Sequence, residues 1–515
     1  MIQRLRLAAA LASVAVLAAC SGGSSAKSGA SLLPPSHPGT TATAAKLTIA
    51  GVGDSLTAGE QSDGLVGANL PIIAATSPVG QIGPVQATQE YGFFSLLWQQ
   101  ANGVGLATMS NPTLSPLPLI TPPGLGSLLA PTSLGFPYAV TGECTGTQTA
   151  ANAFSTALTL RENPALNPWD VGIPGQTVHE ALYMIGAIGN CSVSATNSSP
   201  EIADLNALVN GESQNFWPIL AGFGQGVTQV EAAASLHAQV ATVWLGSNDL
   251  LKFALSDGEA PVTTPSSMQT DLTTIIKTLQ QSGSKVAIAN LVDVMGAATF
   301  IPQPAYEAEL QAFLTAGIEK EEPALPAVGA QGIAQAYATA YASQEIAQTG
   351  LGTAGYFTID ALFATLDTAL TQISTQATPV APTIPPSQIV PDAVATEVKA
   401  LNTEYNGAIA AAASATGAAL VDVHTAFVAI ETAGGVPINP PACCSLIYGG
   451  GFFSLDGLHP SDTGYAIIAN LFITQLNTSY NLGIPPVNVA SVYANDPYAP
   501  GSSNSVFSHL RRTAK

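Results

Sequence analysis

Residues 46–60, KLTIAGVGDSLTAGE, join an apolar run to a glycine-rich turn, and this combination decides the fold. The run has the length and composition of a short buried strand. Gly53 and Gly59 then allow the chain to turn sharply, and Ser55 stands inside that turn. A strand that turns abruptly into a helix presents its turn residues at the edge of a sheet, beside the unpaired N–H groups of the helix start. We therefore expect the Ser55 hydroxyl to lie at such an edge.

Three further apolar runs end in polar residues: ATVWLGSND (241–249), KVAIANLVD (285–293) and AALVDVH (418–424). They are continuous rather than alternating, which is typical of strands buried on both faces of a parallel sheet. Helical patterns over 267–283 and 391–417 lie between them, and each ends at a glycine. The alternation predicts a layered α/β fold. The polar residues that end the strands are expected at the carboxyl edge of the sheet, namely Ser55, Asn248, Asp293 and Asp422.

The composition limits the function. Of the 515 residues, 47% are hydrophobic and only 9% are charged, so the chain can bury a large core. It has 13 Lys and Arg against 33 Asp and Glu, which gives a formal net charge of −20. A chain this acidic repels phosphate backbones, so we expect no nucleic-acid partner. No Cys or His spacing of the metal-binding type is present, and no metal or cofactor is expected.

The N-terminus predicts export. Residues 1–23, MIQRLRLAAALASVAVLAACSGG, place two arginines before an apolar run that is too short to span a bilayer comfortably. LAAC resembles a bacterial lipobox, so 1–19 is interpreted as a lipoprotein signal peptide and Cys20 as the lipidated residue; an ordinary secretory signal is the alternative. We expect a lipid anchor in the outer membrane if the envelope is Gram-negative, and otherwise a periplasmic or extracellular protein. Residues 20–45 predict a flexible tether.

Four short blocks each place a glycine or a polar residue where the chain leads into a helix. They are GDSL (53–56), VGIPGQTVHEAL (171–182), WLGSNDLL (244–251) and DGLHPSDTGYAIIAN (456–470). In this order they resemble the GDSL or SGNH hydrolase family. The resemblance implies a flavodoxin-like three-layer α/β/α sandwich with a central parallel sheet, in a hydrolase domain over 46–478. It also implies a serine esterase that needs no cofactor.

The resemblance gives each block a role. Ser55 matches the nucleophile. The Ser55 N–H, the Gly175 N–H and the Asn248 side-chain amide match the donors that hold an oxyanion. Asp456 and His459 match the last block, in which histidine is the base and aspartate orients it. The residue types suit this chemistry, because a serine hydroxyl needs a neighbouring base and imidazole titrates near neutral pH.

His459 is also the best base by elimination among the six histidines. Two lie in the predicted tether and tail. His237 stands in an alanine-rich segment and is expected to be packed, whereas His179 and His424 could line the site. Only His459 has a carboxylate at a suitable spacing, three residues before it.

Two long segments depart from the alternation of strands and helices, and we interpret them as insertions in one domain. Residues 61–165 are rich in Pro, Leu and Gly, and residues 299–350 have helical patterns. A small independent domain over 61–165 is the alternative. Residues 479–515 are expected to form a C-terminal tail.

Disulfides are expected in an oxidising compartment. The candidate cysteines are Cys144, Cys191, Cys443 and Cys444, which allow three connectivities. Cys144 with Cys191 is the simplest pair, because a bond between the adjacent Cys443 and Cys444 would be strained.

The expected activity is that of an exported, monomeric serine esterase acting on small-molecule or lipid esters. The apolar insertions are expected to roof the site and to favour lipid or fatty-acyl esters. A carbohydrate O-acetyl esterase is the alternative enzyme. A non-catalytic lipoprotein that binds lipid or glycan is the alternative of another class.

Overall fold

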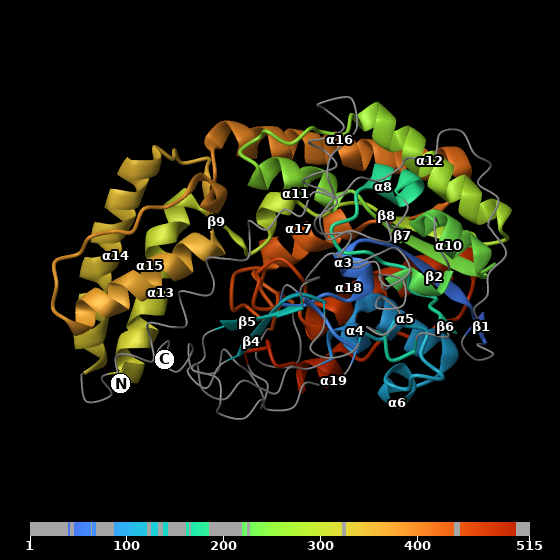
Figure 1. Cartoon of the computed structure of the whole chain (residues 1–515), viewed down its shortest axis with the longest axis horizontal. Coiled ribbons are helices and arrows are strands. Elements are labelled where there is room, and N and C mark those ends of the chain that lie inside the picture. The colour runs from blue at the N-terminus through green and yellow to red at the C-terminus, as the bar shows by residue number, and fades with distance from the viewer. Residues whose placement is uncertain are drawn as a thin grey trace, which may run out of the picture.

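The computed structural model describes most of the chain beyond the predicted signal peptide (Figure 1). The described residues are 40–41, 46–62, 64–67, 87–120, 125–131, 137–142, 161–163, 166–184, 219–223, 227–321, 326–436 and 443–500. The signal peptide, Cys20, Cys144 and Cys191 lie outside these ranges. Within them, no helix combines the length and the apolar character that crossing a bilayer requires.

A four-stranded parallel sheet forms the centre of the described chain, and its strands confirm the four predicted runs. In spatial order they are β12 (Ala419–Val421), β8 (Lys285–Ala289), β7 (Val240–Trp244) and β2 (Ile49–Gly53). Gly53 lies opposite Trp244, so neighbouring strands end at the same edge. Nearly all of their side chains are buried, which explains why the runs are continuously apolar.

The outer edge of β2 is covered by residues 169–173, which run beside it in the parallel sense. Three backbone hydrogen bonds hold this segment: Trp169 O accepts from Gly51 N (2.8 Å), Gly51 O from Val171 N (2.9 Å) and Gly53 O from Ile173 N (3.0 Å). The sheet therefore gains a further extended chain on this side. Just before it, β6 (Leu166–Asn167) pairs in parallel with β1 (Thr40–Thr41), which belongs to the predicted tether.

Helices pack against the sheet on opposite sides. α12 (Pro265–Gln281) and α16 (Asp392–Thr416) lie above the strands in Figure 1, and α5 (Phe93–Asn102) and α18 (Asp462–Tyr480) lie below them. α10 (Gln229–Ser235) packs against α12 and β2. α12 and α16 confirm the two predicted helices. α16 ends at Gly417, whose φ of 69° is the left-handed conformation that glycine adopts most readily.

A cluster of aromatic rings joins the sheet to the lower helices. The Phe93 ring of α5 lies 5.5 Å from the Trp244 ring of β7 and 4.7 Å from the Phe472 ring of α18, between centroids. All three side chains are buried. Since α5 belongs to the segment 61–165, that segment supplies part of the core beneath the sheet.

A helical lobe stands to one side of the sheet, at the left of Figure 1. It consists of α13 (Gln303–Glu321), α14 (Ala327–Thr349) and α15 (Ile359–Ser374). At its base an antiparallel sheet joins β9 (Phe300–Pro302), β10 (Tyr356–Thr358) and β11 (Ile389–Val390). The sequence predicts helices over 299–350; α13 and α14 lie there, and the lobe continues beyond residue 350 with α15.

The remaining described elements complete the fold. A second antiparallel sheet joins β3 (Gly64–Leu65), β4 (Leu125–Pro131) and β5 (Pro137–Gly142). The other helices are α3 (Ser55–Ala58), α4 (Thr88–Tyr91), α6 (Leu106–Met109), α8 (Val178–Tyr183), α11 (Ser247–Leu255), α17 (Val423–Ala433) and α19 (Val489–Tyr493), with 3₁₀ turns at Ala221–Phe223, Val294–Gly296 and Pro386–Gln388.

The chain beyond the predicted domain boundary at residue 478 is folded as far as the described residues reach. The boundary falls inside α18. Asp496 is fully buried and accepts hydrogen bonds from the backbone N (2.8 Å) and the hydroxyl (2.6 Å) of Thr463 in α18. Residues after α18 therefore help to anchor the helix that begins inside the last sequence block.

Candidate active site

Ser55 lies where β2 ends, at the start of the single-turn helix α3. Asp54 caps this helix, with its Oδ1 accepting from Leu56 N at 3.0 Å, and Gly59 ends it with a φ of 79°. Burial raises the pKa of Asp54 to about 7, although the Leu56 N–H and the positive charge of His459 act against the rise. Asp54 therefore shapes the turn that presents Ser55 at the sheet edge.

Gly175 forms the turn that leads the covering segment into α8. Its φ is 76°, a conformation that favours glycine. Thr177 caps α8 through a capping box with Glu180, in which each side chain accepts from the backbone N–H of the other residue. The Oδ2 atom of Asp249 accepts from the next backbone N–H, that of Val178, at 3.1 Å. The second sequence block is thus fixed against the third.

Asn248 lies in the first turn of α11, directly after β7. Its Nδ2 donates to the backbone O of Gln176 at 3.2 Å, so it lies beside the turn that contains Gly175. A side-chain amide has two N–H groups, and this bond uses one of them. The second N–H of the Asn248 amide can donate to another acceptor.

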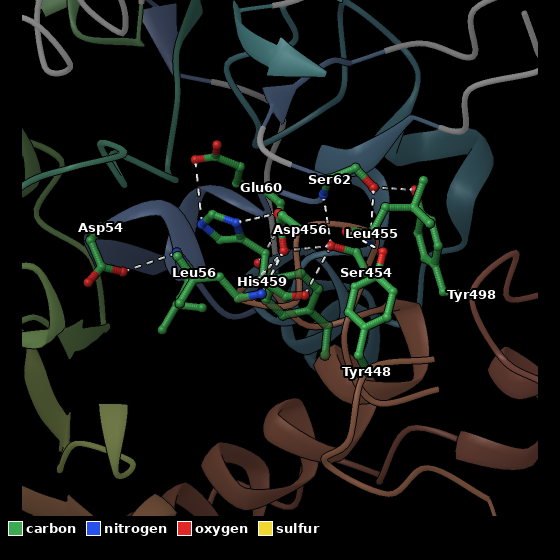
Figure 2. A network of polar contacts seen from close by, with 12 residues as sticks. Asp54, Leu56, Glu60, Ser62, Tyr448, Ser454, Leu455, Asp456, His459 and Tyr498 are labelled. Atoms are coloured by element: carbon green, nitrogen blue, oxygen red, sulfur yellow. Dashed lines mark hydrogen bonds and ion pairs between the residues drawn. The ribbon is translucent and has the colours of Figure 1, made fainter. Parts of the chain in front are cut away.

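Asp456 and His459 share a loop ahead of α18 (Figure 2). His459 Nδ1 donates to Asp456 Oδ2 at 2.7 Å, while Asp456 Oδ1 accepts from the backbone N of Leu458 and of His459, both at 2.8 Å. Burial would raise the pKa of Asp456, but the charge of His459 and these hydrogen bonds hold it below its usual 3.8. The pair is therefore built around an ionised carboxylate, which fixes the proton of the neutral imidazole on Nδ1.

Glu60 is a site residue that sequence reasoning missed. Its Oε2 lies 3.8 Å from His459 Nε2, and both side chains are buried. Figure 2 shows the imidazole between Glu60 and Asp456. The motif GDSL contains no signal for this contact, because it depends on the left-handed turn at Gly59 and on packing with a loop four hundred positions away.

Ser55, Asn248 and His459 line one cavity of about 790 Å³, a volume that includes its open mouth. Gly175 is not among its lining residues. The walls are largely apolar and include Trp244, Leu251, Val294, Phe427, Val428 and Phe453. They come from the ends of strands, from α11 and α17, and from the loops after β8 and before α18.

The expectation that insertions roof the site stays a prediction, because large parts of 61–165 lie outside the described residues. None of the described residues in 61–165 or 299–350 lines the cavity. Among the residues that the structure describes, the apolar surface comes from segments close to the sheet edge, above all α17 and residues 446–460. The sequence of these segments does not predict a cavity wall, because their apolar residues are few and scattered.

The other described histidines lie in different surroundings. His424 lines the cavity. His179 Nδ1 lies 2.9 Å from Asp271 Oδ2, and its pKa is raised by this hydrogen bond. His237 was expected to be packed, but it is exposed and donates from Nδ1 to Ser282 O at 3.1 Å, because it follows α10 in a turn with a φ of 49°.

Cys443 and Cys444 form a disulfide with each other in the structure. Both are buried, and they precede the loop that carries Leu446 and Phe453 into the cavity wall. The preference for a Cys144–Cys191 pair concerns residues outside the described ranges. Among the residues the structure describes, no group of three or more His, Cys, Asp and Glu side chains is arranged to hold a metal ion.

Comparison of the chain with models of protein families, with curated proteins and with solved structures finds no match. The geometry of the site is therefore the basis on which a function is assigned.

Proposed function

We propose that this protein is a serine hydrolase that cleaves carboxylic esters through an acyl-enzyme on Ser55. The observation that carries the proposal is the shared cavity: a serine at a strand end, a buried side-chain amide, and a histidine bonded to an ionised aspartate all face it. An isolated serine in a turn would carry no such meaning, since turns commonly contain serine.

In the proposed reaction, Ser55 Oγ attacks the ester carbonyl while His459 Nε2 takes the hydroxyl proton. Asp456 stabilises the imidazolium that forms. The negative charge on the former carbonyl oxygen is held by the Ser55 N–H and the second hydrogen of Asn248 Nδ2. The Gly175 N–H, which does not line the cavity, is the third donor that the family resemblance implies. His459 then returns the proton to the leaving alcohol, and water releases the acid from Ser55 by the same steps.

The strand order supports the finer fold expected for such an enzyme. Along the chain the five extended segments follow one another as β2, the covering segment, β7, β8 and β12. Numbered in that sequence, they lie across the sheet in the spatial order 2-1-3-4-5. This is the order of a flavodoxin-like α/β/α sandwich, in which ligands bind where the order reverses, between the first and third strands. Ser55 follows the first of these strands and Asn248 the third, which places both at that point.

The walls favour an ester with an apolar acyl group. Trp244, Leu251 and Phe427 offer little to the hydroxyl groups of a sugar, and they suit a hydrocarbon chain. We therefore propose lipid or fatty-acyl esters as the substrate class, ahead of acetylated carbohydrates.

We also propose that the chain is exported and anchored by lipid on Cys20, on the basis of the LAAC sequence alone. The mass of the N-terminal peptide from purified membranes tests this proposal, since an unmodified cysteine or an intact signal peptide would contradict it.

The esterase proposal is tested with p-nitrophenyl esters from acetyl to palmitoyl, using protein that lacks residues 1–20 and its Ser55→Ala variant. We expect the variant to lose activity by at least about a thousandfold, because the residual rate comes only from substrate binding and the oxyanion donors. Its thermal unfolding should match that of the parent. Equal rates for the two proteins would exclude the assignment, and a preference for acetyl esters would exclude the lipid substrate.

A further inference from the structure

Glu60 places a second buried carboxylate against the proposed catalytic histidine. The side chains of His459 and Glu60 are only 6% and 5% exposed. The Oε2 atom of Glu60 is 3.8 Å from His459 Nε2, beyond hydrogen-bond distance but within the range of an ion pair. The contact therefore acts through charge, on the nitrogen opposite the one that Asp456 holds.

The main chain of Glu60 is fixed by hydrogen bonds on both sides. Its backbone N donates to Ser55 O at 3.0 Å, and its backbone O accepts from the Tyr465 hydroxyl at 2.7 Å. Tyr465 belongs to α18, the helix that follows the His459 loop. One residue thus connects the serine turn with the histidine loop.

A carboxylate lies beside each of the two ring nitrogens of His459. Asp456, from the same loop, holds Nδ1, and Glu60, from the turn after α3, faces Nε2. Burial raises the pKa of Asp54, at the start of α3, and the positive charge of the imidazole acts against this rise. The neighbouring hydroxyl of Tyr465, whose pKa burial raises, stays neutral. Two carboxylates therefore act on the two ring nitrogens.

We propose that Glu60 is a positioning residue whose negative charge stabilises the protonated form of His459 and sets the lower pH limit of activity. The inference rests on the proposed role of His459 as the base. An opposite charge within about 4–6 Å favours the charged form of its partner, typically by one to three pH units. When Ser55 gives its proton to Nε2, the imidazolium lies between Asp456 and Glu60, so each ring nitrogen has a carboxylate beside it.

The test is Glu60→Gln in the full-length chain, which keeps the shape of the side chain and removes its charge. We expect the pH at which the His459 imidazole is half protonated to fall by about one pH unit or more. This is followed by NMR of histidine labelled with ¹³C at Cε1, with the His459 signal assigned from a His459→Gln variant. The acid limb of kcat/KM should move to lower pH by the same amount.

Glu231→Gln is the matched control. Glu231 is a buried glutamate on α10 whose carboxylate accepts from the backbone N of Thr228. It should leave both the imidazole titration and the acid limb unchanged, which separates the charge of Glu60 from a general effect of altering a buried glutamate.

Each outcome decides the inference. If Glu60→Gln fails to fold, Glu60→Asp withdraws the charge from the ring and should give a smaller shift in the same direction. An imidazole titration identical to that of the wild type, in whichever variant folds, overturns the inference. A shifted titration in a protein without esterase activity would reject the proposed function and still support the charge effect of Glu60.

Discussion

The sheet edge and the helical lobe each bury a carboxylate, and they treat it in opposite ways. At the sheet edge, Asp456 lies beside His459 and two backbone N–H groups, and its pKa is held below 3.8 although burial opposes this. In the lobe, Glu345 of α14 is fully buried, and burial raises its pKa to about 7. Its hydrogen-bond partners, Thr365 and Tyr306, offer only neutral hydroxyls.

The difference shows that burial alone does not determine the charge of a carboxylate in this protein. A cationic partner and several N–H donors outweigh the loss of water at Asp456, whereas two hydroxyls cannot do so at Glu345. The sheet edge therefore keeps a negative charge that can orient and stabilise an imidazolium. The lobe holds a carboxyl group that is largely protonated below neutral pH, as a structural hydrogen-bonding group would be.

The largest effect is expected where the charge at the sheet edge is removed. Asp456→Asn keeps an oxygen for the N–H groups of Leu458 and His459 but replaces the ionised partner of His459 Nδ1 with an amide. The imidazole then loses both its stabilising charge and its fixed tautomer, so kcat should fall by about 10⁴-fold. Ester hydrolysis measures kcat, and circular dichroism verifies that the variant is folded.

Asp293→Asn is the matched control for this prediction. Asp293 lines the same cavity, and its Oδ1 caps a short turn by accepting from Met295 N at 3.0 Å. Its loss of kcat should stay below about tenfold. An Asp456→Asn variant that retains a tenth of the wild-type kcat would contradict the role given to Asp456.

The next effect concerns stability in the lobe. The folded state holds the Glu345 proton more tightly than the unfolded chain, whose pKa is 4.5, so the contribution of Glu345 to stability is greatest below pH 4.5. It is lost as the pH rises to about 7, which corresponds to at most about 3 kcal/mol. Glu345→Gln cannot ionise, so it should match the wild type near pH 4.5 and exceed it by up to about 3 kcal/mol at pH 8. Urea unfolding at the two pH values measures this.

Glu307→Gln tests whether burial is the cause. Glu307 is an exposed glutamate of α13 that accepts from the Thr339 hydroxyl at 2.6 Å. Its replacement should change stability by the same small amount at both pH values. A stability difference between Glu345→Gln and wild type that does not grow with pH would show that Glu345 is already ionised in the folded protein.

The same contrast explains which features the sequence predicts. The four strands and the two long helices are predictable because both faces of each strand are apolar and glycines end the helices, as at Gly417. Asp456 and His459 are predictable as a pair because three positions in one loop suffice to join them. Local patterns therefore locate the sheet edge.

Contacts between distant segments carry no such pattern. Glu60 and His459 meet only because two loops pack together, and Glu345 meets Thr365 only because α14 and α15 are neighbours. The segment 169–173 is short and lies between Pro168 and Pro174, yet it pairs with β2 along its backbone, which no side-chain pattern reveals. For the same reason the expectation of a lid stays a prediction, since the composition of an insertion does not say which surface it covers.

The smallest effect is expected at the mouth of the cavity. The sheet edge and the helical lobe each expose a valine, so the two can be compared directly. Val428 of α17 is 46% exposed and lines the cavity, whereas Val328 of α14 is 82% exposed in the lobe. Val428→Ser removes apolar surface that would contact a long acyl chain but not an acetyl group. Since half-burying two methyl groups is worth roughly 0.7 kcal/mol, the ratio of kcat/KM for palmitoyl to acetyl esters should fall about threefold. Val328→Ser should leave the ratio unchanged, and equal ratios in both variants would place the acyl chain elsewhere in the cavity, away from α17.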